Sequence, residues 1–193
     1  MGLLDSLPLP PICRMRRLTT YFALFLTLQF NCNGQSIFNL TDSVFKVGQI
    51  QKIHVTYDFS GGCHPRVESV PLLDSIYDFL EKNRDLKIEV GGHTDYRGDS
   101  ITNKRLSDMR ASRVKEYFIE KGIDINRLEH KGYGEYRPTI VDAKTNEQYP
   151  FLNLGQKLTE DYIKKLDTVE KQEIAHMLNR RTEIKIIDKT NRP

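Results

Sequence analysis

The chain has 193 residues, 38% of them hydrophobic and 28% charged, which excludes a bundle of membrane-spanning helices and an intrinsically disordered chain. Its net charge of +3 is too small to indicate nucleic acid binding, and its three cysteines are too few for a disulfide scaffold or a zinc ribbon. The length fits one domain with a short appendage, and composition alone names no function.

The first 34 residues have the pattern of a secretory signal. A basic stretch, Arg14-Met15-Arg16-Arg17, precedes a mostly apolar run without charge from Leu18 to Phe30. This run is shorter than the ~20 residues that span a bilayer. We therefore predict cleavage after Gly34, with a retained membrane anchor as the alternative. A start at Met15 would give a more compact signal and make residues 1–14 an artefact of the start site, and lipidation of Cys32 is a further alternative.

Beyond the signal we expect a short lead at 35–49, one domain at 50–188 and a tail at 189–193. Alternating β-branched and aromatic residues predict strands, and apolar residues at steps of three and four predict helices. In chain order, we predict a strand at 50–59, a helix at 66–83, a strand at 86–90, a polar Gly-rich loop at 91–99, a helix at 101–121, a strand at 128–132, an insertion at about 139–168, a helix at 169–178 and a strand at 182–187.

This order predicts an α/β fold of the type β-α-β-α-β, with a long insertion before the last helix and strand. The helices are expected to pack on one mixed sheet, and right-handed crossovers would place the first two on the same face. In the second helix, Gly122 predicts the C-terminal end, and the predicted apolar stripe consists of Leu106, Met109, Val114, Tyr117 and Phe118. After cleavage Cys63 would be the only cysteine, and we expect its thiol to be buried.

Three polar residues around the second helix carry the strongest chemical pattern. Asn103 lies two helical turns before Arg110 and on the same face, and Asp95 lies in the preceding loop. A carboxylate, a guanidinium and a carboxamide that converge would bind a zwitterion, with Asp95 taking an ammonium group and Arg110 a carboxylate. Spacing alone leaves a surface salt bridge with a helix cap as the alternative.

Five ordered motifs make the chain recognisable. They are GGHTDYRGD at 91–99, NKRLSDMRASRV at 103–114, GIDINRL at 122–128, GYGEYRP at 132–138 and NRRTEIKI at 179–186. In this order they resemble the OmpA-like peptidoglycan-binding domain family, and the resemblance covers roughly Ile50 to Ile187.

The resemblance implies non-covalent binding of peptidoglycan through its diaminopimelate-containing stem peptide. By this match Asp95 would hold the ammonium group of the ligand and Arg110 its carboxylate, with Asn103 between them. Thr94 belongs to the same His-Thr-Asp motif. We therefore expect the protein to anchor or organise the cell envelope, in the periplasm or at the outer membrane.

Two further residues come from the resemblance with less support. Asp58 closes the first predicted strand and matches an acidic residue near the pocket of the family. Arg180 matches the first Arg of Asn-Arg-Arg, which braces the site. Arg97 lies in the same loop as Asp95, where it would crowd or re-tune the pocket.

The sequence indicates no enzyme, because no His, Cys or Ser stands in a catalytic or metal-ligand pattern. We accordingly expect no cofactor and no metal site. The partners that we expect are peptidoglycan and, beside it, outer-membrane proteins. Contact with the membrane would require lipidation or a retained signal. Two alternatives stay open: an interaction module of an envelope or secretion complex, and an uncleaved membrane-anchored protein of the motor-stator type.

Overall fold

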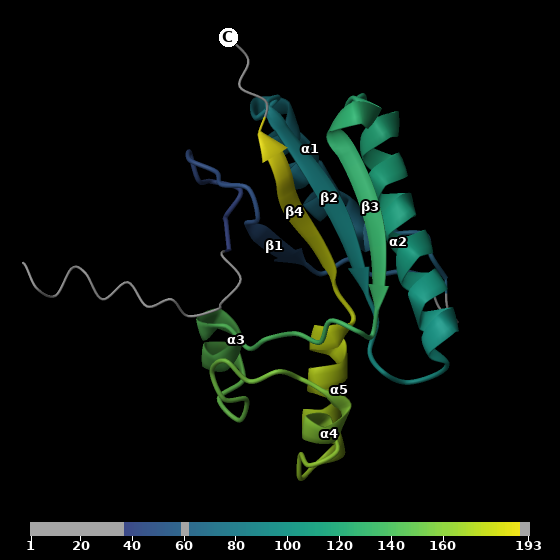
Figure 1. Ribbon diagram of the computed structural model, residues 1–193, viewed down its shortest axis with the longest axis vertical. Coiled ribbons are helices and arrows are strands. Elements are labelled where there is room, and N and C mark those ends of the chain that lie inside the picture. Colours follow the sequence, from purple (N-terminus) through teal and green to yellow (C-terminus); the bar gives the residue numbers. More distant parts are fainter. Residues whose placement is uncertain (1–36, 59–61, 190–193) are drawn as a thin grey trace, which may run out of the picture. The chain divides into compact units, whose positions relative to one another are not determined.

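A mixed four-stranded sheet organises the residues that the computed structural model describes, 37–58 and 62–189 (Figure 1). Its spatial order is β1-β4-β2-β3, in which β2 and β3 are parallel and β4 runs antiparallel to both of its neighbours. The predicted signal lies outside the described residues. The strands are β1 (Ile50–Ile53), β2 (Leu86–His93), β3 (Leu128–Gly134) and β4 (Thr182–Lys189).

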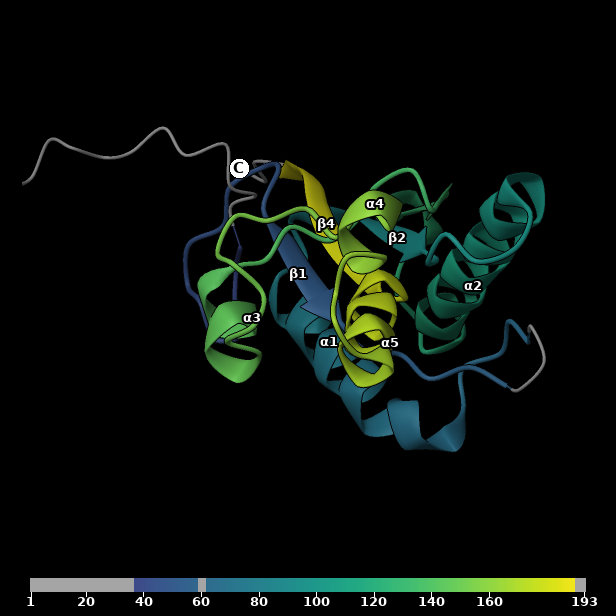
Figure 2. The same cartoon turned by 90° about the horizontal axis from the view of Figure 1, so that it is seen from below.

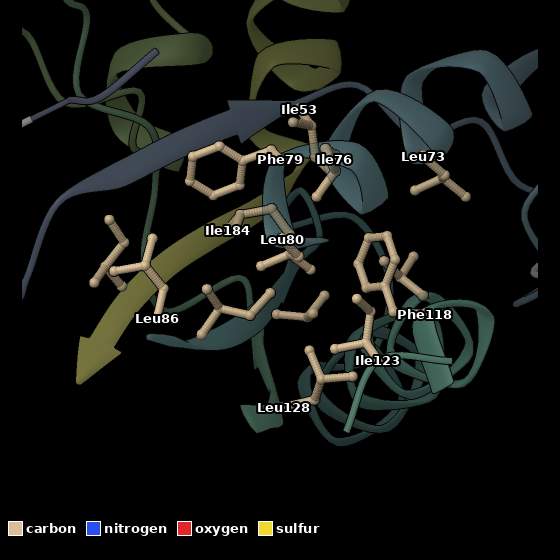
Figure 3. Close-up of a cluster of buried hydrophobic side chains, with 14 of the residues drawn as sticks. Ile53, Leu73, Ile76, Phe79, Leu80, Leu86, Phe118, Ile123, Leu128 and Ile184 are labelled. Carbon is tan, nitrogen blue, oxygen red and sulfur yellow. The ribbon is translucent and has the colours of Figure 1, made fainter. Parts of the chain in front are cut away.

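Two helices, α1 (Val70–Lys82) and α2 (Ser100–Glu120), pack on one face of this sheet. Side chains of both helices and of all four strands belong to one hydrophobic cluster, which confirms the prediction that the helices share a face. Burying each large apolar side chain contributes roughly 1.5–3 kcal/mol. Labelled members of this cluster in Figure 3 include Ile53, Leu73, Ile76, Phe79, Leu80, Leu86, Phe118, Ile123, Leu128 and Ile184.

The face that α2 presents to the sheet differs from the predicted stripe. Of that stripe only Val114 and Phe118 are buried, whereas Met109 is 44% exposed. Glycines in the strands explain the difference. A Cβ at Gly92 would lie 2.1 Å from a backbone oxygen of α2, and one at Gly132 would lie 2.3 Å from a backbone nitrogen. Where the backbones approach this closely there is room only for small side chains, and Ser107 and Ala111 lie there. The other buried residues of α2 are Asn103, Val114 and Phe118.

The ends of α2 follow its sequence signals. The carboxylate of Asp99 accepts a hydrogen bond from the backbone N–H of Thr102 at 2.7 Å, an N-terminal cap. At the other end Gly122 has a φ of +105°, a left-handed conformation that favours glycine. This confirms the predicted end of the helix.

All four strands differ in length from the prediction, and β3 and β4 each end two residues later than predicted. β2 continues to His93, because Gly92 allows the strand to pass directly under α2. β1 ends at Ile53, which pairs with the first residue of β4, Thr182, so the chain beyond has no strand beside it. The first predicted strand, at 50–59, was therefore too long.

The predicted insertion folds around its own core at one end of the sheet (Figure 1, Figure 2). It contains α3 (Ala143–Gln148) and α4 (Glu160–Ile163), and α5 (Val169–Asn179) follows. A second hydrophobic cluster joins these segments, formed by Val141, Leu152, Leu158, Ile163 and Ala175. The insertion is therefore packed against α5 rather than looped out. The buried free thiol of Cys63 agrees with expectation. No helix among residues 37–58 and 62–189 is both long and apolar enough to cross a membrane.

Candidate binding site

The candidate residues meet where β2 ends, close to the connection between α5 and β4 (Figure 1). Thr94 and Asp95 directly follow β2, and the backbone N–H of Thr94 donates to the carbonyl of Gly134 at 3.0 Å. Arg180 lies in the two-residue connection between α5 and β4. Segments about 85 residues apart in the chain thus supply one site.

The carboxylate of Asp95 is buried, at 6% exposure, and is surrounded by donors. Its Oδ1 accepts the backbone N–H of Arg97 at 3.0 Å. Its Oδ2 accepts Nε and Nη2 of Arg97 at 3.2 and 2.8 Å, and Nη1 of Arg180 at 2.6 Å. Burial acts to raise the pKa of Asp95, but the hydrogen bonds from Arg97 and Arg180 outweigh it and lower the pKa below its ordinary value. The aspartate is therefore ionised and tightly held.

Arg97 links Asp95 to α5. Its Nη1 donates to Oε1 of Glu173, on α5, at 2.5 Å. The hydrogen bond to Asp95 is the main reason that the pKa of Arg97 is raised. The sequence predicted that Arg97 would crowd the site, and this arrangement agrees with that prediction. The guanidinium group of Arg97 is bonded to the carboxylate of Asp95, which was predicted to bind an ammonium group.

A pocket of about 330 Å³ lies beside this ion cluster. Arg110 and Arg180 line it, and Asp95 lies behind this lining as the hydrogen-bond partner of Arg180. Arg110 is held by two contacts: its Nε donates to the carbonyl of Gly62 at 3.2 Å, and its guanidinium carbon lies 4.6 Å from the ring centre of Tyr57. The remaining lining residues are His54, Val55, Thr56, Tyr57, Arg66, Gly92, His93, Met177, Arg181 and Thr182.

The electrostatics of this pocket favour an anion. Burial lowers the pKa of Arg110, the nearby Tyr57 acts in the opposite direction, and the like charge of Arg180 lowers the pKa further. Burial raises the pKa of Tyr57 to about 12, and its hydroxyl pairs with Oγ1 of Thr182 at 2.7 Å. Tyr57 is therefore neutral near pH 7. Two guanidinium groups facing one pocket repel each other, and a bound carboxylate would relieve that repulsion.

Asn103 contacts its own chain. Its Nδ2 donates to the carbonyls of Asp95 and Arg97, both at 3.2 Å, and to Oε2 of Glu135 at 2.7 Å. These bonds occupy the amide donors that the sequence pattern offered to a ligand, and they hold the loop at 95–97 in place. The backbone N–H of Asp58 donates to the carbonyl of His64, and its side chain is exposed. The structure thus brings Asp95, Asn103, Arg110 and Arg180 together.

Comparison with known proteins agrees with the motifs. Residues 68–150 match the model of the OmpA family. This segment belongs to the OmpA family. Over 84 residues the chain is 34% identical to outer membrane protein P5 of Haemophilus influenzae, which covers 44% of this chain and 24% of that protein. Over 85 residues it is 35% identical to the peptidoglycan-associated lipoprotein of the same species, which covers 44% and 52%.

Two other proteins are similar to this chain. It is 35% identical over 91 residues to photosystem I P700 chlorophyll a apoprotein A2 of Gloeobacter violaceus, covering 47% of this chain and 10% of that protein. The matched part of the chain spans about half the length of these curated relatives or less. Among solved structures, the peptidoglycan-associated lipoprotein from Burkholderia pseudomallei is similar, with a TM-score of 0.47, 21% identity, and coverage of 68% of this chain and 86% of that chain.

Sequence reasoning missed a buried ion cluster next to the pocket. Nε of Arg181 donates to Oε1 of Glu183 at 2.8 Å, and Nε2 of His93 lies 3.3 Å from Oε2 of the same glutamate. The ring of Tyr133 stacks on His93 with centres 5.0 Å apart. The sequence did contain a signal for this cluster. Glu183 lies in the alternating apolar strand β4, and a glutamate in a buried strand requires a buried partner.

Proposed function

We propose that this OmpA-family domain binds peptidoglycan without covalent chemistry, by recognising the diaminopimelate-containing stem peptide, and so anchors or organises the cell envelope. The observation that carries the proposal is the pocket lined by Arg110 and Arg180 beside the buried carboxylate of Asp95. One end of diaminopimelate bears an ammonium and a carboxylate on the same carbon. Such a ligand requires a cationic group and an anionic group close together, and these residues supply both.

Arg110 is the residue best placed to take the ligand carboxylate. Its Nε bond to Gly62 and its position over Tyr57 fix the direction of the guanidinium group, so less side-chain freedom would be lost on binding. Arg180 supplies a second positive charge on the same wall. A hydrogen bond to a charged group is worth roughly 1.5–3 kcal/mol, so loss of Arg110 alone is expected to reduce affinity at least tenfold.

The relatives support the cellular setting. One is named as an outer membrane protein and another as a peptidoglycan-associated lipoprotein. Together with the predicted secretory signal, these names favour a place in the periplasm or at the outer membrane. Within this proposal the domain recognises its ligand and does not transform it.

The test is sedimentation of purified protein with purified diaminopimelate-type peptidoglycan. Arg110→Ala is expected to leave the protein in the supernatant, whereas Arg105→Ala, which removes one exposed positive charge from the same helix, is expected to sediment like the parent protein. Asp95→Asn is a less clean variant, because it leaves Arg97 and Arg180 without their shared counter-charge. Equal sedimentation of the parent protein and a folded Arg110→Ala variant would refute the site.

The form of the ligand gives a second comparison. Amidation of the diaminopimelate carboxylate removes the charge that Arg110 is proposed to bind. We expect weaker sedimentation with amidated peptidoglycan than with the free form. Equal affinity for both would count against the role of Arg110 while leaving peptidoglycan binding itself intact.

A further inference from the structure

The carboxylate of Asp95 is occupied by its own chain. A carboxylate offers about four acceptor positions, two on each oxygen. Oδ2 accepts three bonds, from Nε and Nη2 of Arg97 and from Nη1 of Arg180, and Oδ1 accepts the backbone N–H of Arg97. Together with its 7% exposed side chain, this leaves Asp95 without room for an ammonium group from a ligand. A donor must therefore leave before such a group can bind.

Of the two arginines, Arg97 has the contacts of a displaceable partner. Its side chain is 46% exposed, and it already contacts a second carboxylate, Glu173, which is 50% exposed. The guanidinium can therefore leave Asp95 and keep an anionic neighbour at the surface. Arg180, by contrast, adjoins the start of β4 and lines the pocket wall.

The loop does not depend on the side chain of Arg97. Its backbone N–H bonds Oδ1 of Asp95, and Nδ2 of Asn103 holds the carbonyls of Asp95 and Arg97. These three bonds survive when the side chain swings away. Its departure would free two acceptor positions on Oδ2 and leave the shape of the site intact.

We propose that Arg97 is an internal competitor for the ligand ammonium group at Asp95, and that it thereby determines affinity and selectivity. The inference rests on the proposed function, since it takes the ligand to be a zwitterion. A ligand with an ammonium group displaces the guanidinium and binds in its place. Its apparent affinity is reduced by the fraction of molecules in which Asp95 is still occupied. A ligand that offers only a carboxylate binds Arg110 without this competition.

The experiment measures binding of two soluble probes by calorimetry. One, the free tripeptide, is L-Ala-γ-D-Glu-meso-diaminopimelate with its N-terminal amine acetylated, and the other, the acetylated tripeptide, is the same tripeptide with the remaining diaminopimelate amine acetylated as well. Arg97→Ala is expected to bind the free tripeptide roughly three- to thirtyfold more tightly than the parent protein, the range set by partly exposed charged hydrogen bonds. Affinity for the acetylated tripeptide is expected to stay unchanged.

Two variants serve as controls. Arg97→Lys keeps a positive charge beside Asp95 and is expected to restore most of the competition. Arg113→Ala removes an arginine of similar exposure from an exposed pair with Glu116, and is expected to change neither affinity. If Arg97 instead only supported the shape of the site, its removal would lower the affinity of the protein for both tripeptides.

The outcomes separate this inference from the proposed function. If the parent protein binds the free tripeptide and Arg97→Ala binds it equally or more weakly, internal competition is wrong and peptidoglycan recognition stands. If neither protein binds either tripeptide or peptidoglycan, the proposed function is wrong and this inference with it. If Arg97→Ala does not fold, the Nε–H resonance of Arg97 in the parent protein decides. It should shift on addition of the free tripeptide and not of the acetylated one, and an unchanged resonance with both would overturn the proposal.

Discussion

The buried charge cluster beside the pocket predicts that this protein loses stability in acid. Glu183 is 5% exposed and contacts both Arg181 and His93. Burial acts to raise the pKa of Glu183, but the contact with His93 and the charge of Arg181 outweigh it and lower the pKa from 4.5 to about 2. The folded state therefore binds a proton at Glu183 more weakly than the unfolded chain does.

The size and sign of the effect follow from this difference. At about 1.4 kcal/mol per pKa unit, the drop to about 2 corresponds to roughly 3 kcal/mol of stability. Because the folded pKa is the lower one, this contribution is complete above about pH 4.5 and disappears as the pH falls towards 2. Burial also lowers the pKa of His93, so its contribution begins to be lost below the ordinary histidine value near 6.5.

Glu183→Gln is the perturbation that tests this reasoning. It leaves the guanidinium group of Arg181, 8% exposed, without its counter-charge, a loss of about 3–5 kcal/mol near pH 7. Glu129→Gln is the matched control, because Glu129 is 52% exposed and pairs with Lys87 at the surface, where loss of a pair costs about 1 kcal/mol or less.

Urea unfolding followed by circular dichroism at pH 7, 5 and 3 measures the effect. The gap in unfolding free energy between the parent protein and Glu183→Gln should narrow by roughly 2 kcal/mol between pH 7 and pH 3. The gap for Glu129→Gln should stay small throughout. A Glu183→Gln protein as stable as its parent at pH 7, or a gap that does not change with pH, would refute the assignment of a buried ion pair.

Two packing predictions concern the parts that frame the site. Gly132→Ala would place its Cβ 2.3 Å from a backbone nitrogen of α2, so we expect a loss of about 3 kcal/mol or more in the free energy of unfolding. In Gly91→Ala the Cβ would meet the ring of Tyr133 at 3.2 Å, and the loss of stability should be smaller. Thermal melting of both variants checks this order. Asn179→Ala removes buried bonds with the N–H of Thr139 and the carbonyl of Leu158, at a cost of about 1–3 kcal/mol each. Amide hydrogen exchange should then rise in the insertion before it rises in β2, and uniform exchange in both would contradict the assigned role of Asn179.

Much of the fold could be predicted because periodicity and caps are local properties. The positions of both long helices, the stop at Gly122 and the shared helix face follow from residues a few positions apart. The face of α2 could not be predicted in this way. Its small polar residues lie against the sheet because glycines 92 and 132, far from most of them in sequence, remove the Cβ atoms that would keep the backbones apart.

In the candidate site, too, some features could be predicted from the sequence and others depend on packing. Spacing predicted that Asp95 and Arg110 converge, and the family resemblance added Arg180, since each is positioned by the backbone of a predicted element. The occupation of Asp95 by Arg97 was not predictable from spacing, because a long side chain can bond any anion within its reach. The interaction with Glu173 depends on how α5 approaches the loop, and that is decided by packing of the insertion.

The placement of α5 ties the insertion to the binding site. One face of this helix carries Glu173, which bonds Arg97, and His176, whose Nδ1 lies 3.7 Å from Oδ2 of Asp95. At its end, Asn179 bonds the insertion while its neighbour Arg180 bonds Asp95. Consecutive residues can serve two partners because the chain leaves the helix there and turns into β4. A shift of the insertion would therefore move the groups that surround Asp95, and the insertion acts as part of the support of the site.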